Sequence, residues 1–316
     1  MYIKMINQLN INAVSFIKIT EKNENQRIDN FLMQLVKDVP KSHIWKIIRN
    51  GEVRVNKKKV DVSHKVQLDD LIRIPPISSN QKEKVCKVSN KIDFPILFED
   101  DYYLIINKPS GVACHGGSNI SHGVIEQLRF IYDKLKFLEL VHRIDKDTSG
   151  ILILAKKRKA LVDLQELIKN GNLHKNYLAL TYGRWHENSV KVKASLYKYL
   201  TKDGERRVTV DENQGQFAYT IFHVIKKFEN CTLVNANIKT GRTHQIRVHL
   251  QHIQHPIIGD EKYGDYEINK QYNKLNLKRM FLHAHKIEFI HPITSLPIKI
   301  EATLPNELDL FLKGLI

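Results

Sequence analysis

The sequence predicts an α+β protein with two domains, a small basic unit of helices and short strands followed by a larger domain with a mainly antiparallel sheet. The chain has 316 residues, which is too long for one small module. Its formal charge of +16 is divided into +8 on residues 1–90 and +8 on the other 226, so the front segment is more than twice as basic per residue. After residue 92, short apolar segments typical of strands outnumber helical patterns.

The composition excludes several classes of protein. With 42% hydrophobic and 27% charged residues, the chain has the make-up of a globular protein with an ample core. Cys86, Cys114 and Cys231 are odd in number and far apart, which argues against a disulfide scaffold and favours a reducing cytoplasm. No apolar run reaches the roughly 20 residues that span a bilayer, and the N-terminus lacks a signal-peptide pattern. The positive charge therefore indicates a polyanionic partner, with nucleic acid ahead of membrane.

The front unit is predicted at residues 26–75. One helical face is outlined by apolar residues at i, i+3, i+4 and i+7, namely Ile28, Phe31, Leu32 and Leu35. Ser42 and Gly51 bracket a second helix. Short strands at 53–55 and 71–74, with Lys57-Lys58 as a turn between them, complete a small α/β unit.

Positive residues crowd around the second helix and the turn that follows it. They are Lys41, Lys46, Arg49, Arg54, Lys57, Lys58 and Lys59. A solvated helix face is the ordinary explanation of such a charge run. However, QRIDNFL at 26–32, followed by PKSHIWKIIRNGEVRVNKKKV at 40–60, resembles the S4 RNA-binding domain. This resemblance implies that the seven residues lie against folded RNA, where recognition depends mostly on phosphates and shape.

Two boundaries complete the predicted domain organisation. Residues 1–25 form a lightly ordered lead-in whose one strand pattern lies at 14–19, and the Pro-, Ser- and Lys-rich stretch 76–92 is typical of a linker. Residues 93–316 form the second domain. Its predicted strands lie at 96–98, 103–106, 151–155, 177–181, 218–224, 232–237 and 287–289, and its clearest helices lie at 160–169 and 245–254.

The densest cluster of polar residues is a loop at 142–149 that leads into an apolar strand. Asp145 lies in this loop between Arg143 and Lys146, whose charges favour the ionised carboxylate. A carboxylate at the edge of a core can act as a nucleophile, a base or a metal ligand. Taken alone, the stretch fits a surface loop with local ion pairs slightly better.

Arg242 and Tyr177 are two further candidate site residues. Arg242 follows a Thr240-Gly241 turn, where its planar fork is placed to pair with a carboxylate or a phosphate. An exposed basic turn explains the same stretch equally well. Tyr177 opens an apolar strand, and a tyrosine at such a position more often packs in the core than takes part in catalysis.

Taken together, the motifs of the second domain resemble the RluA family of RNA pseudouridine synthases. The resemblance is carried by NKPSGV at 107–112, HRIDKDTSGILILAK at 142–156, KNYLAL at 175–180, KTGRTHQIRVH at 239–249 and IIGDEKYG at 257–264. These motifs occur in order over 94–305, and with the S4-like unit they cover nearly the whole chain. The resemblance implies a pseudouridine synthase catalytic domain behind an S4-like domain. It is strongest to the members that modify large-subunit ribosomal RNA.

The resemblance also implies a role for each matching residue. Asp145 corresponds to the essential aspartate that attacks the target uridine, and Arg143 to the arginine that displaces or replaces the flipped base. Tyr177 corresponds to the tyrosine that stacks on the uracil. Arg242 corresponds to the arginine that pairs with the aspartate, and Ile246 to an aliphatic residue that lines the pocket.

The implied reaction converts specific uridines of 23S ribosomal RNA to pseudouridine. The N1–C1′ bond breaks, the uracil turns, and C5 joins C1′ without any redox change, so no cofactor is expected. The base must first leave its stack, at a cost that an inserted side chain and a stacking tyrosine can offset. We expect a cytoplasmic monomer with 23S rRNA as its partner, and neither a membrane nor a metal.

Two other classes of function remain open. A metal enzyme is suggested by His249, His252 and His255, but their spacing does not keep all three on one helical face, and no acidic pair or cysteine completes a ligand set. A non-enzymatic RNA-binding factor would need only the S4-like unit. A separation of Asp145 and Arg242 well beyond about 6 Å, with both in solvent, would favour that binder.

Overall fold

The computed structural model describes residues 13–21, 23–36, 39, 41–77, 92–116, 122–201 and 204–315. Two compact units divide the chain, Met1–Lys87 and Val88–Ile316, and each is described by itself. Most of the predicted linker lies outside the described residues, as does Cys86. None of the helices in the described ranges is long and apolar enough to cross a membrane.

The small unit combines a four-stranded antiparallel sheet with two helices. Its elements are β1 (Ser15–Lys18), α1 (Ile28–Leu35), α2 (Lys41–Arg49), β2 (Arg54–Val55), β3 (Lys58–Lys59) and β4 (Leu71–Ile74), in the sheet order β1-β4-β2-β3. The apolar faces predicted for both helices meet in one core with the sheet. Their buried members are Ile28, Phe31, Leu32, Ile44, Ile47 and Ile48.

Two details of the small unit differ from the prediction. Strand β1 falls within the expected lead-in, yet it pairs with β4, so residues 15–18 belong to the sheet. The turn between β2 and β3 is Asn56-Lys57 rather than Lys57-Lys58. Both turn residues have positive φ, 48° and 68°, as a two-residue type I′ hairpin requires.

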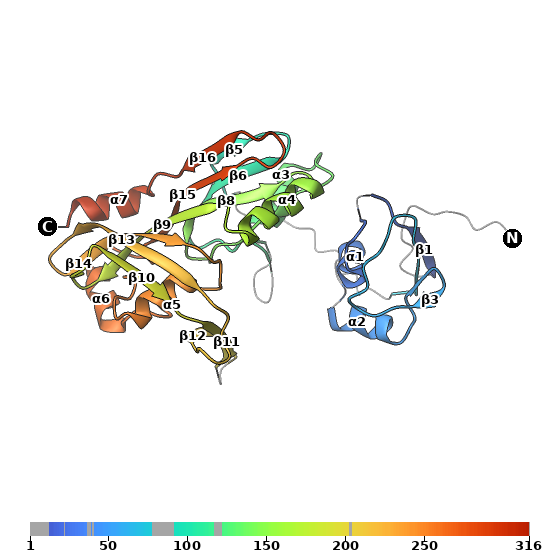
Figure 1. The fold of residues 1–316 in the computed structure, drawn as a ribbon, viewed down its shortest axis with the longest axis horizontal. Coiled ribbons are helices and arrows are strands. Elements are labelled where there is room, and N and C mark those ends of the chain that lie inside the picture. Colours follow the sequence, from blue (N-terminus) through green and yellow to red (C-terminus); the bar gives the residue numbers. More distant parts are fainter. Residues whose placement is uncertain are drawn as a thin grey trace. The chain divides into compact units, whose positions relative to one another are not determined.

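The large unit is built on one mixed sheet with the main order β10-β13-β14-β9-β15-β8-β6-β5 (Figure 1). Its strands are β5 (Ile96–Glu99), β6 (Tyr103–Lys108), β7 (Glu139–Leu140), β8 (Ser149–Ala155), β9 (His174–Tyr182), β10 (Ser189–Lys193), β13 (Tyr219–Lys227), β14 (Cys231–Ile238), β15 (Leu282–Ile290) and β16 (Pro297–Glu301). Among these described strands, only β8 and β15 pair in parallel. The predicted α+β class with a mainly antiparallel sheet is confirmed.

The helices and one hairpin lie around this sheet. The helices are α3 (Val124–Ile131), α4 (Arg158–Lys169), α5 (Gln245–His252), α6 (Tyr266–Lys274) and α7 (Asn306–Lys313). Helices α3 and α4 share the main core with β6 and β8. Strands β11 (Leu196–Leu200) and β12 (Arg206–Val210) form a separate two-stranded sheet, and Figure 1 shows their hairpin projecting from the body of the unit.

The loop that carries Asp145 is fixed by the strand that follows it. Every residue of β8 is buried. Gly150, the second residue of β8, has φ 110°, and a Cβ at this position would collide with the Ala284 carbonyl of β15. Glycine therefore allows β8 and β15 to pair directly after the loop, which holds the loop at the edge of the core.

His249 on α5 is a fully buried, neutral imidazole. Gln245 Nε2 donates to Thr220 Oγ1, which leaves the hydroxyl proton of Thr220 for His249 Nδ1 at 2.9 Å. His249 Nε2–H then donates to the Ala194 carbonyl at 3.3 Å. Burial lowers the pKa of His249 to about 4. Protonation would therefore break this arrangement.

We expect the free energy of unfolding to fall as the pH drops from 6.5 to about 4, by an amount on the order of 3 kcal/mol from His249. In this window the unfolded imidazole binds a proton and the folded one does not, so the contribution is complete only above pH 6.5. Denaturant unfolding of the parent and of His249→Gln at pH 7 and pH 5 measures it. The variant should lose less stability between the two pH values, and equal losses would contradict the assignment.

Candidate functional site

The five residues predicted for the site line a single cavity with a volume of about 1190 Å³ in the large unit. Arg143 and Asp145 come from the loop before β8, and Tyr177 comes from β9. Arg242 comes from the turn before α5, and Ile246 from α5 itself. The fold thus brings together residues that lie about a hundred positions apart in the chain.

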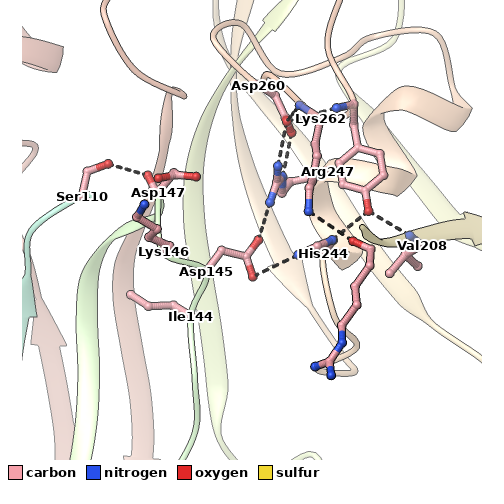
Figure 2. Close-up of polar contacts among 12 residues, drawn as sticks. Ser110, Ile144, Asp145, Lys146, Asp147, Val208, His244, Arg247, Asp260 and Lys262 are labelled. Atoms are coloured by element: carbon pink, nitrogen blue, oxygen red, sulfur yellow. Dashed lines mark hydrogen bonds and ion pairs between the residues drawn. The ribbon is translucent and has the colours of Figure 1, made fainter. Parts of the chain in front are cut away.

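The backbone around Asp145 is held by the segment after β6. Lys108 Nζ, which is fully buried, donates to the carbonyls of Pro109, Val112 and Lys146 at 2.8 to 3.0 Å. Gly111 N also donates to the Lys146 carbonyl at 2.9 Å. Figure 2 shows the neighbouring contact, in which the Ser110 hydroxyl donates to the Asp147 carbonyl at 2.7 Å. These bonds fix the part of the loop that directly follows Asp145.

Asp145 pairs with an arginine on α5. Arg247 Nη1 donates to Asp145 Oδ2 at 2.9 Å, and Arg247 Nε and Nη2 each donate to an oxygen of Asp260 at 2.7 Å. Figure 2 shows the Asp145 carboxylate facing Arg247, with Asp260 on the other side of the guanidinium. Burial alone would lower the pKa of Arg247, but the bonds and charges of Asp260 and Asp145 raise it above its usual value. The guanidinium therefore stays positively charged, and its hydrogen bonds fix its orientation toward Asp145.

The prediction that Arg242 pairs with Asp145 is wrong. The Arg242 side chain is exposed, and its Nε donates to the Phe217 carbonyl at 3.1 Å. The side chain of Gln245 accepts from Arg242 N at 3.0 Å. This bond holds Arg242 in the turn before α5, outside the helix. Arg247 lies on the buried side of the helix that begins after this turn. The ion pair expected of an enzyme is present, with Arg247 in place of Arg242.

His244 approaches the other oxygen of Asp145. The Tyr263 hydroxyl accepts from Val208 N at 2.9 Å, so its own proton is donated to His244 Nδ1 at 2.7 Å. Nε2 of His244 therefore carries the ring hydrogen, and it lies 3.9 Å from Asp145 Oδ1 (Figure 2). Burial lowers the pKa of His244 against the opposing charge of Asp145, which favours the neutral ring. The Asp145 carboxylate is thus faced by the neutral N–H of His244 and not by a second positive charge beside that of Arg247.

Tyr177 presents a neutral ring to the same cavity. Only 7% of its surface is exposed, and no described residue forms a hydrogen bond with its hydroxyl. Burial, and then the charge of Asp145, raises the pKa of Tyr177 above its usual value, so the phenol stays protonated. A neutral phenol ring that borders a cavity can stack on a planar ligand.

Arg143 lies exposed at the cavity and is held by a histidine. Its Nη1 contacts His115 Nε2 at 2.9 Å, and His115 Nδ1 contacts the Gly116 carbonyl at 2.7 Å. Because a guanidinium has only donors, His115 Nε2 accepts and Nδ1 carries the hydrogen.

Ile246 on α5 is 6% exposed and belongs to the apolar core under the cavity. The cavity thus has an apolar floor and an exposed cationic side chain at its edge.

The charge of the cavity lining is almost entirely positive. Asp145 is the one acidic residue among the described residues that line it. The basic lining residues are Arg143, Lys146, Lys175, Lys198, Arg206, Arg207, Arg242 and Arg247. Such a surface attracts a polyanion, and with the tyrosine ring it suits a nucleic-acid strand with one base turned out of its stack.

Two of the three histidines considered as metal ligands, His249 and His255, have other partners. His249 is bonded inside the core as described above. His255 Nδ1 contacts the Tyr182 carbonyl at 2.9 Å, and its ring stacks on Trp185. Within the part of the chain that the structure describes, no group of three or more His, Cys, Asp or Glu residues could hold a metal ion.

The basic residues predicted to meet RNA lie on the small unit. Those with exposed side chains are Lys46, Arg49, Arg54, Lys57, Lys58 and Lys59. Lys41 is the first residue of α2, and its side chain lies outside the description. The β2–β3 hairpin thus carries three adjacent lysines into solvent.

Sequence reasoning missed four residues of the site, Lys108, His244, Arg247 and Asp260. All four lie inside motifs that carry the family resemblance, so the signal was present in the sequence. Their spacing does not reveal which of them faces Asp145. Arg247 and Asp260 in particular are recognised only as a buried pair, which requires the packing of α5 against the loop at 257–264.

Comparison with known proteins agrees with this arrangement in both units. Residues 102–252 match the family described as RNA pseudouridylate synthase, and residues 26–72 match the S4 domain. The chain is 48% identical over 318 residues to the "Ribosomal large subunit pseudouridine synthase C" of Pasteurella multocida, covering 99% of this chain and 96% of that protein. The protein of the same name in Haemophilus influenzae is 46% identical, covering 96% of this chain and 95% of that protein. The resemblance seen in the motifs is confirmed.

Solved structures share the fold of the large unit. The human protein "RNA Pseudouridylate Synthase Domain Containing 4" superposes with a TM-score of 0.57 at 26% identity, covering 69% of this chain and 91% of that one. The human protein "RNA Pseudouridylate Synthase Domain Containing 1" gives a TM-score of 0.56 at 22% identity, covering 71% and 95%, and supports the fold alone. The predicted architecture of an S4 domain followed by this α+β fold is confirmed.

Proposed function

Because the chain belongs to the RNA pseudouridine synthase family, we propose that it converts specific uridines of 23S ribosomal RNA to pseudouridine, with Asp145 as the nucleophile on a flipped-out uridine. The observation that carries the proposal is the Asp145 carboxylate held by Arg247 at 2.9 Å inside a basic cavity. The printed names of the relatives supply the large-subunit substrate.

The reaction is an isomerisation that these groups can perform without a co-reactant. The carboxylate forms a transient bond to the uridine, the N1–C1′ bond breaks, and C5 bonds to C1′. The carboxylate is released, C5 loses its proton, and N1 gains one, so atoms and electrons balance. Arg247 orients the carboxylate through the 2.9 Å hydrogen bond, and its own charge is permanent in this environment.

The other predicted residues would position the nucleotide. Tyr177 would stack on the uracil that has left the RNA helix, and Arg143 would fill the space that the base leaves. Arg143 is suited to this because it is exposed and, among the described residues, only His115 forms a hydrogen bond with its side chain. Ile246 would form the apolar floor beneath the base. Arg242, on the exposed turn, would contact the RNA backbone rather than the nucleophile.

The S4 domain would dock structured RNA through its basic face, and the catalytic domain would act on the uridine. This division agrees with the even split of the charge between a short and a long part of the chain. We place the protein in the cytoplasm with the ribosomal RNA, and we expect it to act as a monomer.

The function is tested by incubating the purified chain with an unmodified 23S rRNA transcript and mapping pseudouridines by a pseudouridine-specific chemical stop of reverse transcription. New stops at a small set of uridines are expected. A 16S rRNA transcript serves as the matched control and should gain none. Stops in 16S but not in 23S rRNA would reject the proposed substrate, and no stops in either would reject the proposed activity.

Replacing Lys57, Lys58 and Lys59 by glutamine should weaken RNA binding without stopping turnover at saturating RNA. Each phosphate contact that is lost should reduce the slope of log affinity against log salt by about 0.7–0.9. Filter binding over a range of salt concentrations measures this slope. A matched triple replacement of the exposed Lys134, Lys136 and Lys299 on the large unit is the control. An equal slope in both triples would remove the hairpin from the docking surface.

A further inference from the structure

Lys175 is a buried lysine that the mechanism above does not use. It lies on β9 two residues before Tyr177, so both side chains are on the face of the sheet that lines the cavity. Only 8% of Lys175 is exposed. Its partners in the neighbouring strands are Ile238 and Ile287, which offer apolar side chains.

The ammonium group of Lys175 has no partner in the part of the chain that the structure describes. No described residue forms a hydrogen bond or ion pair with it. Lys108, the other deeply buried lysine among the described residues, has a structural role, because its Nζ donates to three carbonyls. Burial lowers the pKa of both lysines to about 8, so both remain mostly protonated at neutral pH. Only Lys108 has its charge satisfied by the fold.

The surroundings of Lys175 favour an anion from outside the protein. Burial and then the charge of Lys175 lower the pKa of His142 to about 3, so this neighbour is neutral and supplies no countercharge. Lys175 Nζ also approaches the turn before α5, where a Cβ on Gly241 would lie 3.6 Å from it. The exposed Arg242 is the next residue of that turn. Two cations therefore border the same end of the cavity.

We propose that Lys175 binds a phosphate of the RNA strand next to the target uridine, an inference that rests on the proposed function. Phosphate is the anionic group of an RNA strand, and Asp145 is the one acid among the described lining residues. Lys175 lies about 6.6 Å along β9 from Tyr177, a spacing that suits a uracil on the ring and its backbone at the ammonium. Because Lys175 lines the cavity and no described residue supplies a countercharge, a bound phosphate would supply one.

Three variants test this assignment, Lys175→Met, Lys175→Arg and Lys108→Met, with the exposed Lys299→Met on β16 as the matched control. Affinity for the 23S rRNA transcript is measured by filter binding at several salt concentrations, and thermal unfolding is followed for each variant. Lys175→Met should bind roughly tenfold more weakly or worse at low salt. Its slope of log affinity against log salt should be smaller by about 0.7–0.9, whereas Lys175→Arg and Lys299→Met should keep the parent slope.

Thermal unfolding separates this binding role from a structural one. Lys175→Met should unfold at the parent temperature or above it, because it removes a buried charge that has no partner. Lys108→Met should unfold at a lower temperature, because three carbonyls lose their donor. A parent-like slope and affinity in Lys175→Met would overturn the inference, and so would a loss of stability like that of Lys108→Met.

The outcome can be distinguished from failure of the proposed function. Pseudouridine formation by the parent chain in 23S rRNA tests the function, and the affinity and slope of Lys175→Met test the phosphate contact. If the parent is active and Lys175→Met binds like the parent, only the inference fails. If the parent is inactive but its binding depends on Lys175 as expected, the phosphate contact stands and the function fails.

Discussion

Replacing Arg247 by methionine is expected to lower the free energy of unfolding by about 3–5 kcal/mol and to abolish activity. The reason is Asp260, which is 1% exposed and receives two hydrogen bonds from the guanidinium. Without Arg247, Asp260 becomes a buried charge that lacks its cation. Asp145 loses its 2.9 Å partner in the same step. One substitution thus removes both a structural ion pair and the group that orients the nucleophile.

The matched control is Arg242→Met, five residues earlier in the same motif. Because Arg242 is exposed and donates only to a backbone carbonyl, its loss should change stability by no more than about 0.5 kcal/mol. Denaturant unfolding of both variants measures the difference. Asp260→Asn in the Arg247→Met background should recover part of the loss, since the two residues are coupled. Equal stability of Arg247→Met and Arg242→Met would refute the buried pair.

Much of the fold was predictable because its strongest local patterns coincide with its core. The apolar faces of α1, α2 and α4 and the apolar runs of β6 and β8 are visible in the sequence, and these segments are buried. Helix α6 was missed because Tyr272 is its one buried residue, although Asp265 caps it by accepting from Ile268 N. The β11–β12 hairpin was missed because it lies outside the main sheet and has little apolar periodicity.

The site was predictable as a set of residues but not as a set of contacts. Asp145, Tyr177 and Arg143 do line one cavity, as the motifs implied. The choice between Arg242 and Arg247 depends on where the turn ends and the helix begins. That point is set by the left-handed backbone of His244, at φ 53°, which a non-glycine residue seldom adopts. No spacing rule contains this information.

Asp145→Asn is expected to reduce the rate of pseudouridine formation by at least about 10⁴-fold while RNA binding stays nearly intact. An amide has the shape of the carboxylate but is not a comparable nucleophile, so the covalent step is lost. RNA contacts come from the basic lining and from the S4 domain, neither of which this change removes. Filter binding with the 23S rRNA transcript checks that the variant still binds.

Asp147→Asn is the matched control, because Asp147 is exposed in the same loop and only its carbonyl is bonded, to Ser110 and Arg279. The substitution removes the same charge two residues away and leaves the backbone contacts in place. It should retain the activity of the parent.

The most direct measurement is single-turnover release of tritium from a 23S rRNA transcript labelled at C5 of uridine, since C5 loses its hydrogen when it bonds to C1′. The parent and Asp147→Asn should release tritium at similar rates, and Asp145→Asn should release none above background. Release by Asp145→Asn at a rate near that of the parent would contradict the assignment of Asp145 as the nucleophile.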